Sequence, residues 1–338
     1  MTAPKGQVLL AHGDGGLLTH RLISEVFLPQ LGNPVLARLE DAAVLELEGC
    51  RLAFTTDSFV VRPLFFPGGD IGRLAVCGTV NDLSMVGARP LYLSAGFLLE
   101  EGLDLEVLER VVASMCSAAA EAGVRVVAGD TKVVERGSVD GVFINTAGLG
   151  VVPPALRMGP ETVRAGDRLL VSGPVGEHAL AVVLARGDLE IESTIRSDCA
   201  PLNGLVGDIM TQCPGALRFM RDPTRGGLAT VACEMAVACG LDFYLLEDGI
   251  PLTEEAGALC DLLGLDPLYL ANEGKFLAVV DRDQADRVLE ICRAHPLGAG
   301  AALVGEARSG RGQAYLVTAL GGTRRLDLPA GAQFPRIC

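Results

Sequence analysis

The sequence predicts a two-domain α/β protein, and three observations support this fold class. A chain of 338 residues is long enough for two domains that each bury a core. Hydrophobic residues make up 49% of the chain and glycine occurs 42 times, which is typical of a globular protein with many tight turns. Segments with helical periodicity alternate with short apolar segments that are typical of strands.

The charge and the hydropathy pattern exclude several classes of partner. The formal net charge is −14 and no cluster of lysines and arginines stands out, so we expect no nucleic-acid binding. No apolar run reaches the roughly 18 residues that a membrane span needs, and the N-terminus lacks a signal pattern. We therefore expect a cytoplasmic protein with no membrane partner. An acidic chain can still bind a nucleotide if its carboxylates hold Mg²⁺ against the phosphates.

The first half of the chain is expected to alternate helices and strands. A glycine-rich turn at 12–16 leads into a helix, for which Thr19 is a suitable N-cap. Further helices are predicted at 71–86 and from Asp104 to Gly123, two residues that can cap the ends of the second helix. Strands are predicted at 44–48, 51–61, 91–98, 124–128 and 142–152; the fourth strand runs straight into residues 129–132, and a glycine-containing turn then leads to the fifth.

The second half repeats this alternation after an expected linker, formed by Pro153-Pro154 and the polar stretch to Asp167. We place the domain boundary near residue 155, with domains at 1–155 and 156–329. Residues 330–338 contain glycine and proline without helical periodicity, so we expect a mobile C-terminal tail. Strands are predicted near 168–172, 241–246, 276–281 and 315–319, and helices near 177–184, 202–211, 228–239 and 285–295.

Three aspartates are candidate metal ligands. Asp57, Asp82 and Asp130 each stand beside a small or polar residue at the end of a predicted strand or helix. Carboxylate oxygens suit Mg²⁺, and such ligands converge in loops at the ends of α/β elements. The alternative is that each aspartate only caps a helix or a turn.

Two glycine-rich turns and two glycine-flanked charges are candidate anion-binding or pocket groups. His12-Gly13-Asp14-Gly15-Gly16 and Arg225-Gly226-Gly227 each precede a predicted helix, where free backbone N–H groups can bind phosphate. Neither turn matches a known phosphate-binding fingerprint, so a purely structural turn is the alternative. Lys132 and Glu273 could belong to a pocket, but solvated surface charges are the alternative that spacing alone favours.

The last residue, Cys338, differs from the other cysteines. The chain has 10 cysteines without CxxC pairs, and its 4 histidines show no zinc-ligand spacing. A thiol at the end of a flexible arm could serve as a covalent carrier that moves between sites. It is not a prenylation signal, which places cysteine four residues from the end. The alternative is a tail that ends in cysteine by accident.

Taken together, these motifs resemble the HypE family of hydrogenase maturation factors, the carbamoyl dehydratases that make cyanide ligands for nickel–iron hydrogenases. The resemblance covers nearly the whole chain. Several motifs are shared with aminoimidazole ribonucleotide synthetase, selenophosphate synthetase and thiamine-monophosphate kinase, whereas the terminal Pro-Arg-Ile-Cys is specific to the family. The matching stretches are 12–16, 55–61, 67–72, 81–83, 128–132, 221–227, 272–274 and 335–338.

The resemblance implies a PurM-like fold with an N-terminal domain that dimerises through a β-barrel and a C-terminal α+β domain. ATP would bind in the cleft between the two domains. The resemblance also implies that Asp57, Asp82 and Asp130 hold Mg²⁺ and that Lys132 and Glu273 are catalytic, with either as the base. Cys338 would be carbamoylated and dehydrated to a thiocyanate. ATP would be bound by His12, Gly13, Asp14, Gly15, Gly16, Thr56, Asp57, Asn81, Asp82, Asp130 and Arg225.

The implied partners are a second copy of the chain, the carbamoyltransferase HypF as carbamoyl donor and the HypC-HypD complex as cyanide acceptor. Two positions depart from the family: Pro223 stands where alanine is usual, and Asp14 where serine is frequent. Two rival functions stay open. A related kinase or selenophosphate synthetase is one, although no cysteine precedes Cys50, where the selenium enzyme would need a reactive group. An assembly scaffold that only binds metal or partners through its thiol is the other.

Overall fold

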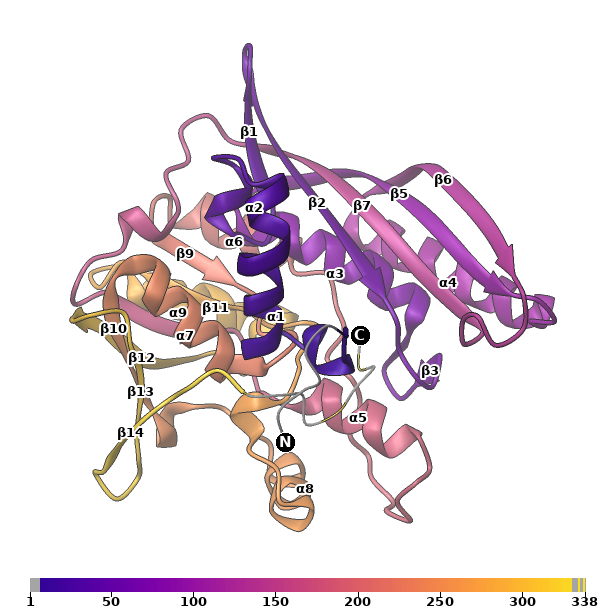
Figure 1. Cartoon of the computed structure of the whole chain (residues 1–338). Coiled ribbons are helices and arrows are strands. Elements are labelled where there is room, and N and C mark those ends of the chain that lie inside the picture. Colours follow the sequence, from indigo (N-terminus) through magenta and orange to yellow (C-terminus); the bar gives the residue numbers. More distant parts are fainter. Residues whose placement is uncertain (1–6, 330–333, 335–336, 338) are drawn as a thin grey trace.

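The computed structural model describes residues 7–329, 334 and 337, and its strands form two large sheets, one in each half of the chain (Figure 1). The first sheet has the order β1-β2-β7-β5-β6, in which only β5 and β6 run parallel. These strands are β1 (Ala43–Leu47), β2 (Cys50–Phe59), β5 (Arg89–Glu100), β6 (Arg125–Val134) and β7 (Val142–Val152). A short ribbon of β3 (Phe65–Phe66) and β4 (Gly69–Asp70) precedes the first long helix.

Two helices, α3 (Ile71–Met85) and α4 (Leu105–Ala122), pack on one face of the first sheet (Figure 1). The predicted caps of α4 are confirmed: the Asp104 side chain accepts from the Glu106 N–H at 2.9 Å, and Gly123 ends the helix with φ 69°. Burial along β7 alternates from residue to residue, since only one face meets the helices. The other face of this sheet stays open to solvent at several apolar side chains.

Two predictions for the first half are wrong in detail. Thr19 lies inside α1 (Leu17–Leu22) and Gly16 occupies the N-cap, while the Thr19 hydroxyl accepts from the Gly15 N–H at 3.0 Å. The helical segment continues through a π-helical turn, Ile23–Phe27, into α2 (Leu28–Leu31). Strand β6 runs to Val134, so residues 129–132 belong to the strand, because pairing with β5 extends it beyond its apolar part.

The second sheet has the order β14-β13-β10-β12-β8-β11-β9 and carries helices on both faces. In β8, Leu169 and Val171 pack with α7, whereas Leu170 packs in the cluster that includes α6 and α9. Strands β9, β12 and β14 and helix α8 have no counterpart in the prediction. The elements are β8 (Arg168–Val171), β9 (Leu217–Arg221), β10 (Leu241–Leu246), β11 (Leu277–Val280), β12 (Ala302–Ser309), β13 (Ala314–Val317), β14 (Thr323–Arg325), α5 (Glu177–Ala185), α6 (Asn203–Gln212), α7 (Gly227–Cys239), α8 (Glu254–Leu263) and α9 (Ala285–Ala294).

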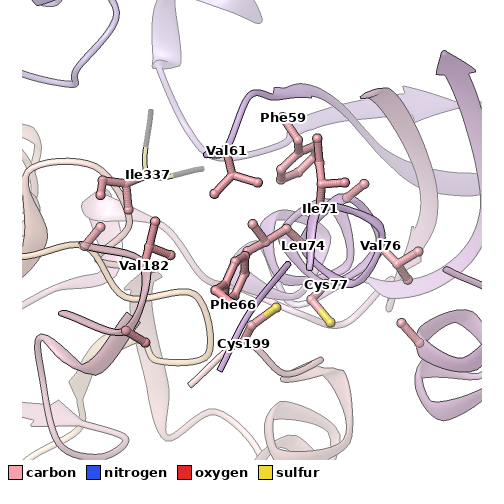
Figure 2. Close-up of a cluster of buried hydrophobic side chains, with 14 of the residues drawn as sticks. Phe59, Val61, Phe66, Ile71, Leu74, Val76, Cys77, Val182, Cys199 and Ile337 are labelled. Atoms are coloured by element: carbon pink, nitrogen blue, oxygen red, sulfur yellow. The ribbon is translucent and has the colours of Figure 1, made fainter. Parts of the chain in front are cut away.

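One hydrophobic cluster joins the two halves of the chain (Figure 2). Phe59, Phe66 and Leu74 come from the first half, and Val182 and Cys199 from the second. This shared core fixes the two sheets relative to each other, because separating them would expose buried apolar surface. Within the part of the chain that the structure describes, no helix has the length and apolarity to cross a membrane.

Candidate functional site

A cavity of about 630 Å³ lies between the two halves and is lined by charged groups from both. The first half contributes residues of β2 and α3, together with the glycine-rich turn before α1. The second half contributes the segment after β9, part of α7 and one residue of the turn before β11. The lining includes Gly15, His20, Arg38, Asp41, Thr56, Asp57, Asp82, Arg221, Asp222, Arg225, Glu234 and Glu273.

Asp57 and Asp82 reach this cavity because β2 and α3 lie against each other. Asp57 is paired in register with Thr146 of β7, which faces α3, so the aspartate is on the helix side of the sheet. Asp82 follows Asn81 on α3 and accepts a hydrogen bond from the Thr55 hydroxyl at 2.8 Å. The predicted convergence of these two aspartates is therefore present in the structure.

The carboxylates of the cavity repel one another. Burial raises the pKa of Asp82 well above its usual range, and the charges of Asp222 and Asp57 raise it further. Burial also raises the pKa of Asp222 well above its usual range, with Asp41 adding to the shift. The pKa of Asp57 is raised by burial, although Arg225 opposes this. A cluster of this kind favours a cation, since a positive charge would relieve the repulsion.

Glu273 is buried in the same site and one of its oxygens is unsatisfied. Its side chain is 3% exposed, and Oε1 has no hydrogen-bond partner among the described residues. Burial raises its pKa well above the usual range, and Asp222 and Asp198 raise it further. A buried carboxyl group with a free oxygen has the environment of a general acid or base.

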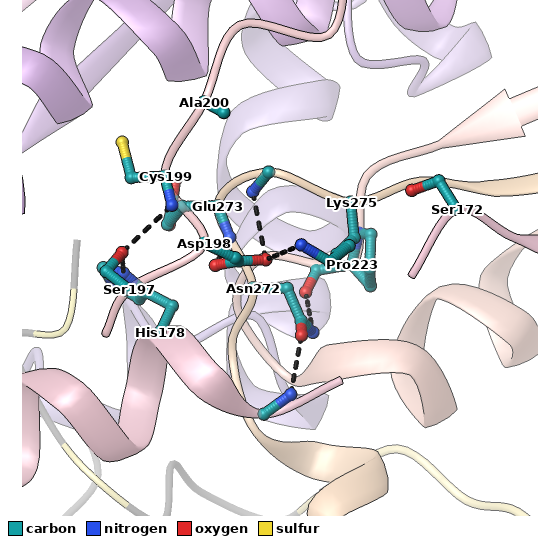
Figure 3. A network of polar contacts seen from close by, with 12 residues as sticks. Ser172, His178, Ser197, Asp198, Cys199, Ala200, Pro223, Asn272, Glu273 and Lys275 are labelled. Atoms are coloured by element: carbon teal, nitrogen blue, oxygen red, sulfur yellow. Dashed lines mark hydrogen bonds and ion pairs between the residues drawn. The ribbon is translucent and has the colours of Figure 1, made fainter. Parts of the chain in front are cut away.

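The turn that carries Glu273 is held by Asp198 (Figure 3). Asp198 accepts from the Glu273 N–H at 3.0 Å and the Gly274 N–H at 3.3 Å, and pairs with Lys275 at 3.2 Å. Burial acts to raise the pKa of Asp198, but the Lys275 ammonium and these hydrogen bonds outweigh it, so the pKa is lowered. A Cβ at position 274 would lie 1.9 Å from the Asp198 carbonyl oxygen, so only glycine fits there.

The two glycine-rich turns that the sequence singled out lie side by side, although some 210 residues separate them. The Arg225 guanidinium donates to the Gly13 carbonyl at 3.1 Å, and a Cβ on Gly15 would lie 3.0 Å from the Arg225 Cβ. Of this set, Gly15 and Arg225 line the cavity. Arg225 stands just before the N-terminus of α7, where backbone N–H groups favour an anion.

Besides Asp130, five of the expected nucleotide ligands do not line the cavity. Asn81 instead serves as a clamp: its amide donates to the carbonyls of Ala200 and Glu273, each at 3.1 Å, and accepts from the Leu202 N–H at 2.8 Å. These three hydrogen bonds tie together the backbone segments that carry the site, which is a structural role. The other four, His12, Gly13, Asp14 and Gly16, belong to the turn behind Gly15.

Asp130 and Lys132 are not brought to the cavity by their own chain. They form an exposed ion pair at 3.3 Å on β6, the edge strand farthest from β1. Asp130 is paired with Gly96 of β5, which is paired with Asn145 of β7. The next residue of β7, Ile144, is buried on the helix side, so Asn145 faces the other way. Cross-strand partners share a face, so Asp130 points away from α3 and α4. One chain by itself therefore does not bring Asp130 and Lys132 to Asp57 and Asp82, and their place in the site stays a prediction.

Sequence reasoning missed several charged residues of the cavity. Asp222 follows strand β9, which the sequence did not predict, and Asp41 precedes β1. Arg221 binds both Asp41 and Glu234, each at 2.9 Å, and so joins the two halves of the chain. A signal for Asp222 was available, because it stands within the matched stretch 221–227, three residues before Arg225.

The donor set suits ATP with Mg²⁺. Within the described ranges, no three His, Cys, Asp or Glu side chains are grouped closely enough to hold a metal ion alone. Mg²⁺ ordinarily takes one or two protein carboxylates, with phosphate oxygens and water in the remaining positions. Asp57 and Asp82, with their raised pKa values, fit that pattern, and Arg225 and Gly15 line the same cavity.

The C-terminal tail is only partly described. Cys338 lies outside the described residues, so its position is not part of the structure. Ile337 is 7% exposed and belongs to the core cluster between the two halves, with Phe334 packed against it (Figure 2). The structure thus places the apolar Ile337 side chain in the core between the two halves, while the mobility of the tail stays a prediction.

Comparison with known families agrees with the fold and the cavity. Residues 39–152 match the family described as AIR synthase related protein, N-terminal domain, and residues 164–317 match the corresponding C-terminal domain. The two sheets and the cleft between them thus define the AIR synthase related class. Within this class the chain belongs to the carbamoyl dehydratase HypE family. It is 51% identical to carbamoyl dehydratase HypE of Rhodobacter capsulatus, over 98% of each chain.

Two solved structures extend this similarity. A structure of a HypE–HypF complex contains a chain with a TM-score of 0.87 and 47% identity, covering 91% of this chain and 99% of that one. A hydrogenase maturation protein HypE in complex with ATP has a TM-score of 0.82 and 48% identity, covering 98% and 100%. The family and the fold inferred from the motifs are confirmed.

Proposed function

We propose that this protein dehydrates the carbamoylated thiol of its own Cys338 to a thiocyanate, using ATP, and so supplies cyanide for a nickel–iron hydrogenase. The observation that carries the proposal is a cavity that combines clustered carboxylates with an unsatisfied, buried Glu273. The similarity to a HypE that binds ATP supports ATP as the second substrate. The terminal Cys338 supplies the thiol.

The reaction converts an S-carboxamide, S–C(=O)–NH₂, into S–C≡N. The carboxamide oxygen attacks the γ-phosphate of ATP, which releases ADP and turns a poor leaving group into a phosphate ester. Cleavage of the C–O bond then releases inorganic phosphate, and both N–H protons leave. We assign Glu273 as the base that accepts an amide proton, because its Oε1 is buried and unpartnered. Lys132 is the alternative base.

Asp57 and Asp82 would hold Mg²⁺, which neutralises charge on the phosphates when it is bound. Gly15 and Arg225 would contact the nucleotide, since both line the cavity beside these carboxylates. We propose that Asp130 and Lys132 reach the site from a second copy of the chain. Their place on an open face of the first sheet supports a dimer in which that face is covered.

We propose HypF as the carbamoyl donor, which the similarity to a HypE chain in a HypE–HypF complex supports. The cyanide acceptor would be the HypC-HypD complex, as the resemblance of the motifs implies. Neither partner is a nucleic acid or a membrane.

Intact-mass measurement of the C-terminal peptide tests this function. With carbamoyltransferase and carbamoyl phosphate, the parental protein should gain one carbamoyl group, and it should lose one water after ATP is added. Cys338→Ala should show neither change and should still bind ATP, because the tail is the substrate. Asp82→Asn should accept the carbamoyl group but lose dehydration by about 10²-fold or more. Carbamoylation of the alanine variant would place the thiol elsewhere.

A small-molecule kinase of the same fold is the second candidate. It has no use for a terminal thiol, so a Cys338→Ala variant that phosphorylates a small molecule at the parental rate would favour the kinase.

A further inference from the structure

The last described residue of the chain is held by one histidine. The Ile337 carbonyl oxygen lies 3.0 Å from His178 Nε2, and this carbonyl belongs to the peptide bond that leads to Cys338. His178 stands on α5, is fully buried and packs edge-on against the Phe66 ring, with 5.5 Å between ring centroids. The Ile337 side chain lies in the same apolar cluster as Val61 and Val182 (Figure 2).

The hydrogen bonds around His178 select one tautomer. A carbonyl oxygen only accepts, so Nε2 must carry the proton that it donates to Ile337. Burial lowers the pKa of His178, which keeps the ring neutral, so Nδ1 accepts from the Ser197 hydroxyl at 2.8 Å. The Ser197 oxygen in turn accepts from the Cys199 N–H at 3.1 Å, so every polar atom in this chain of bonds has a partner.

The segment that fixes His178 is also the segment that holds the candidate base. Ser197 binds His178, and the next residue, Asp198, binds the Glu273 and Gly274 N–H groups (Figure 3). The tail contact and the turn of Glu273 are thus supported by two adjacent residues of one irregular segment between α5 and α6. Because Ser197 and Asp198 are joined by one peptide bond, the tail contact at His178 and the turn of Glu273 cannot move far relative to each other.

We infer that His178, oriented by Ser197, is a positioning residue that anchors the last peptide bond of the tail and thereby presents Cys338 to the site that contains Glu273. The role given to this anchor, presentation of Cys338, rests on the proposed function. The anchor itself is a property of the folded chain and can be measured without ATP or carbamoyl groups. The described contact of His178 with the tail is to the Ile337 backbone carbonyl, so its role is one of position.

Protection of the C-terminus against carboxypeptidase Y measures the anchor. Protection is defined as the rate of residue loss from a free peptide with the same last five residues, divided by the rate of loss from the full-length protein. Both rates are followed by intact mass. This ratio reports how often the tail leaves its slot when exchange is fast. We expect protection to fall about fivefold in His178→Gln and about tenfold or more in Ile337→Asp, each compared with its matched peptide.

Ile337→Asp changes only the tail, so it tests the anchor even if His178→Gln disturbs the buried core. His295→Gln, the same substitution at the end of α9, is the control and should keep parental protection. Parental protection near one, or protection unchanged in Ile337→Asp, would overturn the inference. The His178→Gln variant should also dehydrate carbamoylated Cys338 more slowly at saturating ATP, while its KM for ATP stays at the parental value. A protected parental tail that is never dehydrated would overturn the proposed function and leave the anchor standing.

Discussion

The environment of Glu273 lowers the stability of the fold and suits proton transfer. It is buried, one of its oxygens has no partner among the described residues, and Asp222 and Asp198 lie close enough to raise its pKa. An ionised carboxylate in such a place is costly, which is why it is stable mainly in its protonated form. Sites of this kind are retained where the group transfers a proton.

We expect Glu273→Gln to lower the rate of dehydration by about 10²-fold to 10⁴-fold, because an amide accepts no proton. In the parental protein the acid limb of the rate profile should lie above the ordinary glutamate pKa of 4.5, since the folded pKa is raised. Intact-mass kinetics across a pH series measures both. Glu290→Gln, on the exposed face of α9, is the control and should keep the parental rate and profile.

The same variant carries a prediction for stability, and its sign is opposite to that of most core substitutions. The folded state holds the Glu273 proton more tightly than the unfolded chain does, so ionisation lowers the free energy of unfolding as pH rises from 4.5 towards the folded pKa. Glutamine does not ionise, so the Glu273→Gln variant does not lose free energy of unfolding in this way. The Tm of Glu273→Gln at pH 8 should therefore equal or exceed the parental Tm in calorimetry, and a markedly lower Tm would contradict the charge argument.

At the scale of elements, helix α7 sets the position of Arg225 through two glycines. Gly226 and Gly227 have φ of 76° and 64°, a backbone region that other residues avoid. A Cβ on Gly227 would lie 2.6 Å from the carbonyl oxygens of Leu268 and Leu270. The start of α7 is therefore fixed both by its own conformation and by close contact with the next turn.

Gly227→Ala should lower the free energy of unfolding by about 2 to 4 kcal/mol, from left-handed strain together with the backbone clash. Gly240→Ala, at the other end of the same helix, has a similar φ of 66° but nothing within 4 Å of the added Cβ. It should cost only about 1 kcal/mol, so the difference isolates the clash. Denaturant midpoints measure both, and equal losses would show that close packing at Gly227 contributes nothing.

The sequence predicted elements well where local signals agree. Helix α4 is confirmed at both ends because Asp104 and Gly123 act through neighbouring backbone groups. Strand β6 was cut short at residue 128, since Gly129 and Asp130 have low strand propensity and only pairing with β5 keeps them extended. The prediction of Thr19 as a cap failed for a similar reason, because the carbonyl of Pro329 accepts from the Leu17 N–H and extends the helix.

At the scale of the whole molecule, the open face of the first sheet carries both apolar side chains and the Asp130–Lys132 pair. Phe54 and Leu98 are 45% and 39% exposed and lie, by strand alternation, on the same face as Asp130. Phe54→Lys with Leu98→Lys should convert a dimer into a monomer in light scattering at micromolar concentration. Leu262→Lys on α8, at a still more exposed leucine, is the control and should leave the mass unchanged.

If the dimer supplies Asp130 to the partner's cavity, complementation should reveal it. Asp82→Asn and Asp130→Asn should each lose ATP-dependent dehydration. Dimers that combine the two variants contain one site with both aspartates intact, so random exchange should restore about one quarter of the parental rate. Activity that stays at the level of the separate variants after exchange, confirmed by native mass, would place Asp130 outside the site.

The division of the chain near residue 155 stays a prediction, while the two-sheet architecture and the family are confirmed. The sequence by itself determined the alternation of elements and the caps of α4, and it supplied the candidate acids Asp57, Asp82 and Glu273 and the candidate thiol Cys338. These depend on periodicity and on short motifs, which local backbone chemistry produces wherever they occur.

Only the tertiary structure decided which of the candidates meet. It brought Asp222 to the cavity, turned Asn81 into a backbone clamp, kept Asp130 on an outer face, and placed the Ile337 carbonyl against His178. Each of these outcomes depends on contacts between segments tens to hundreds of residues apart. Such contacts are set by sheet order and by the packing of the two halves, which no local pattern in the chain encodes.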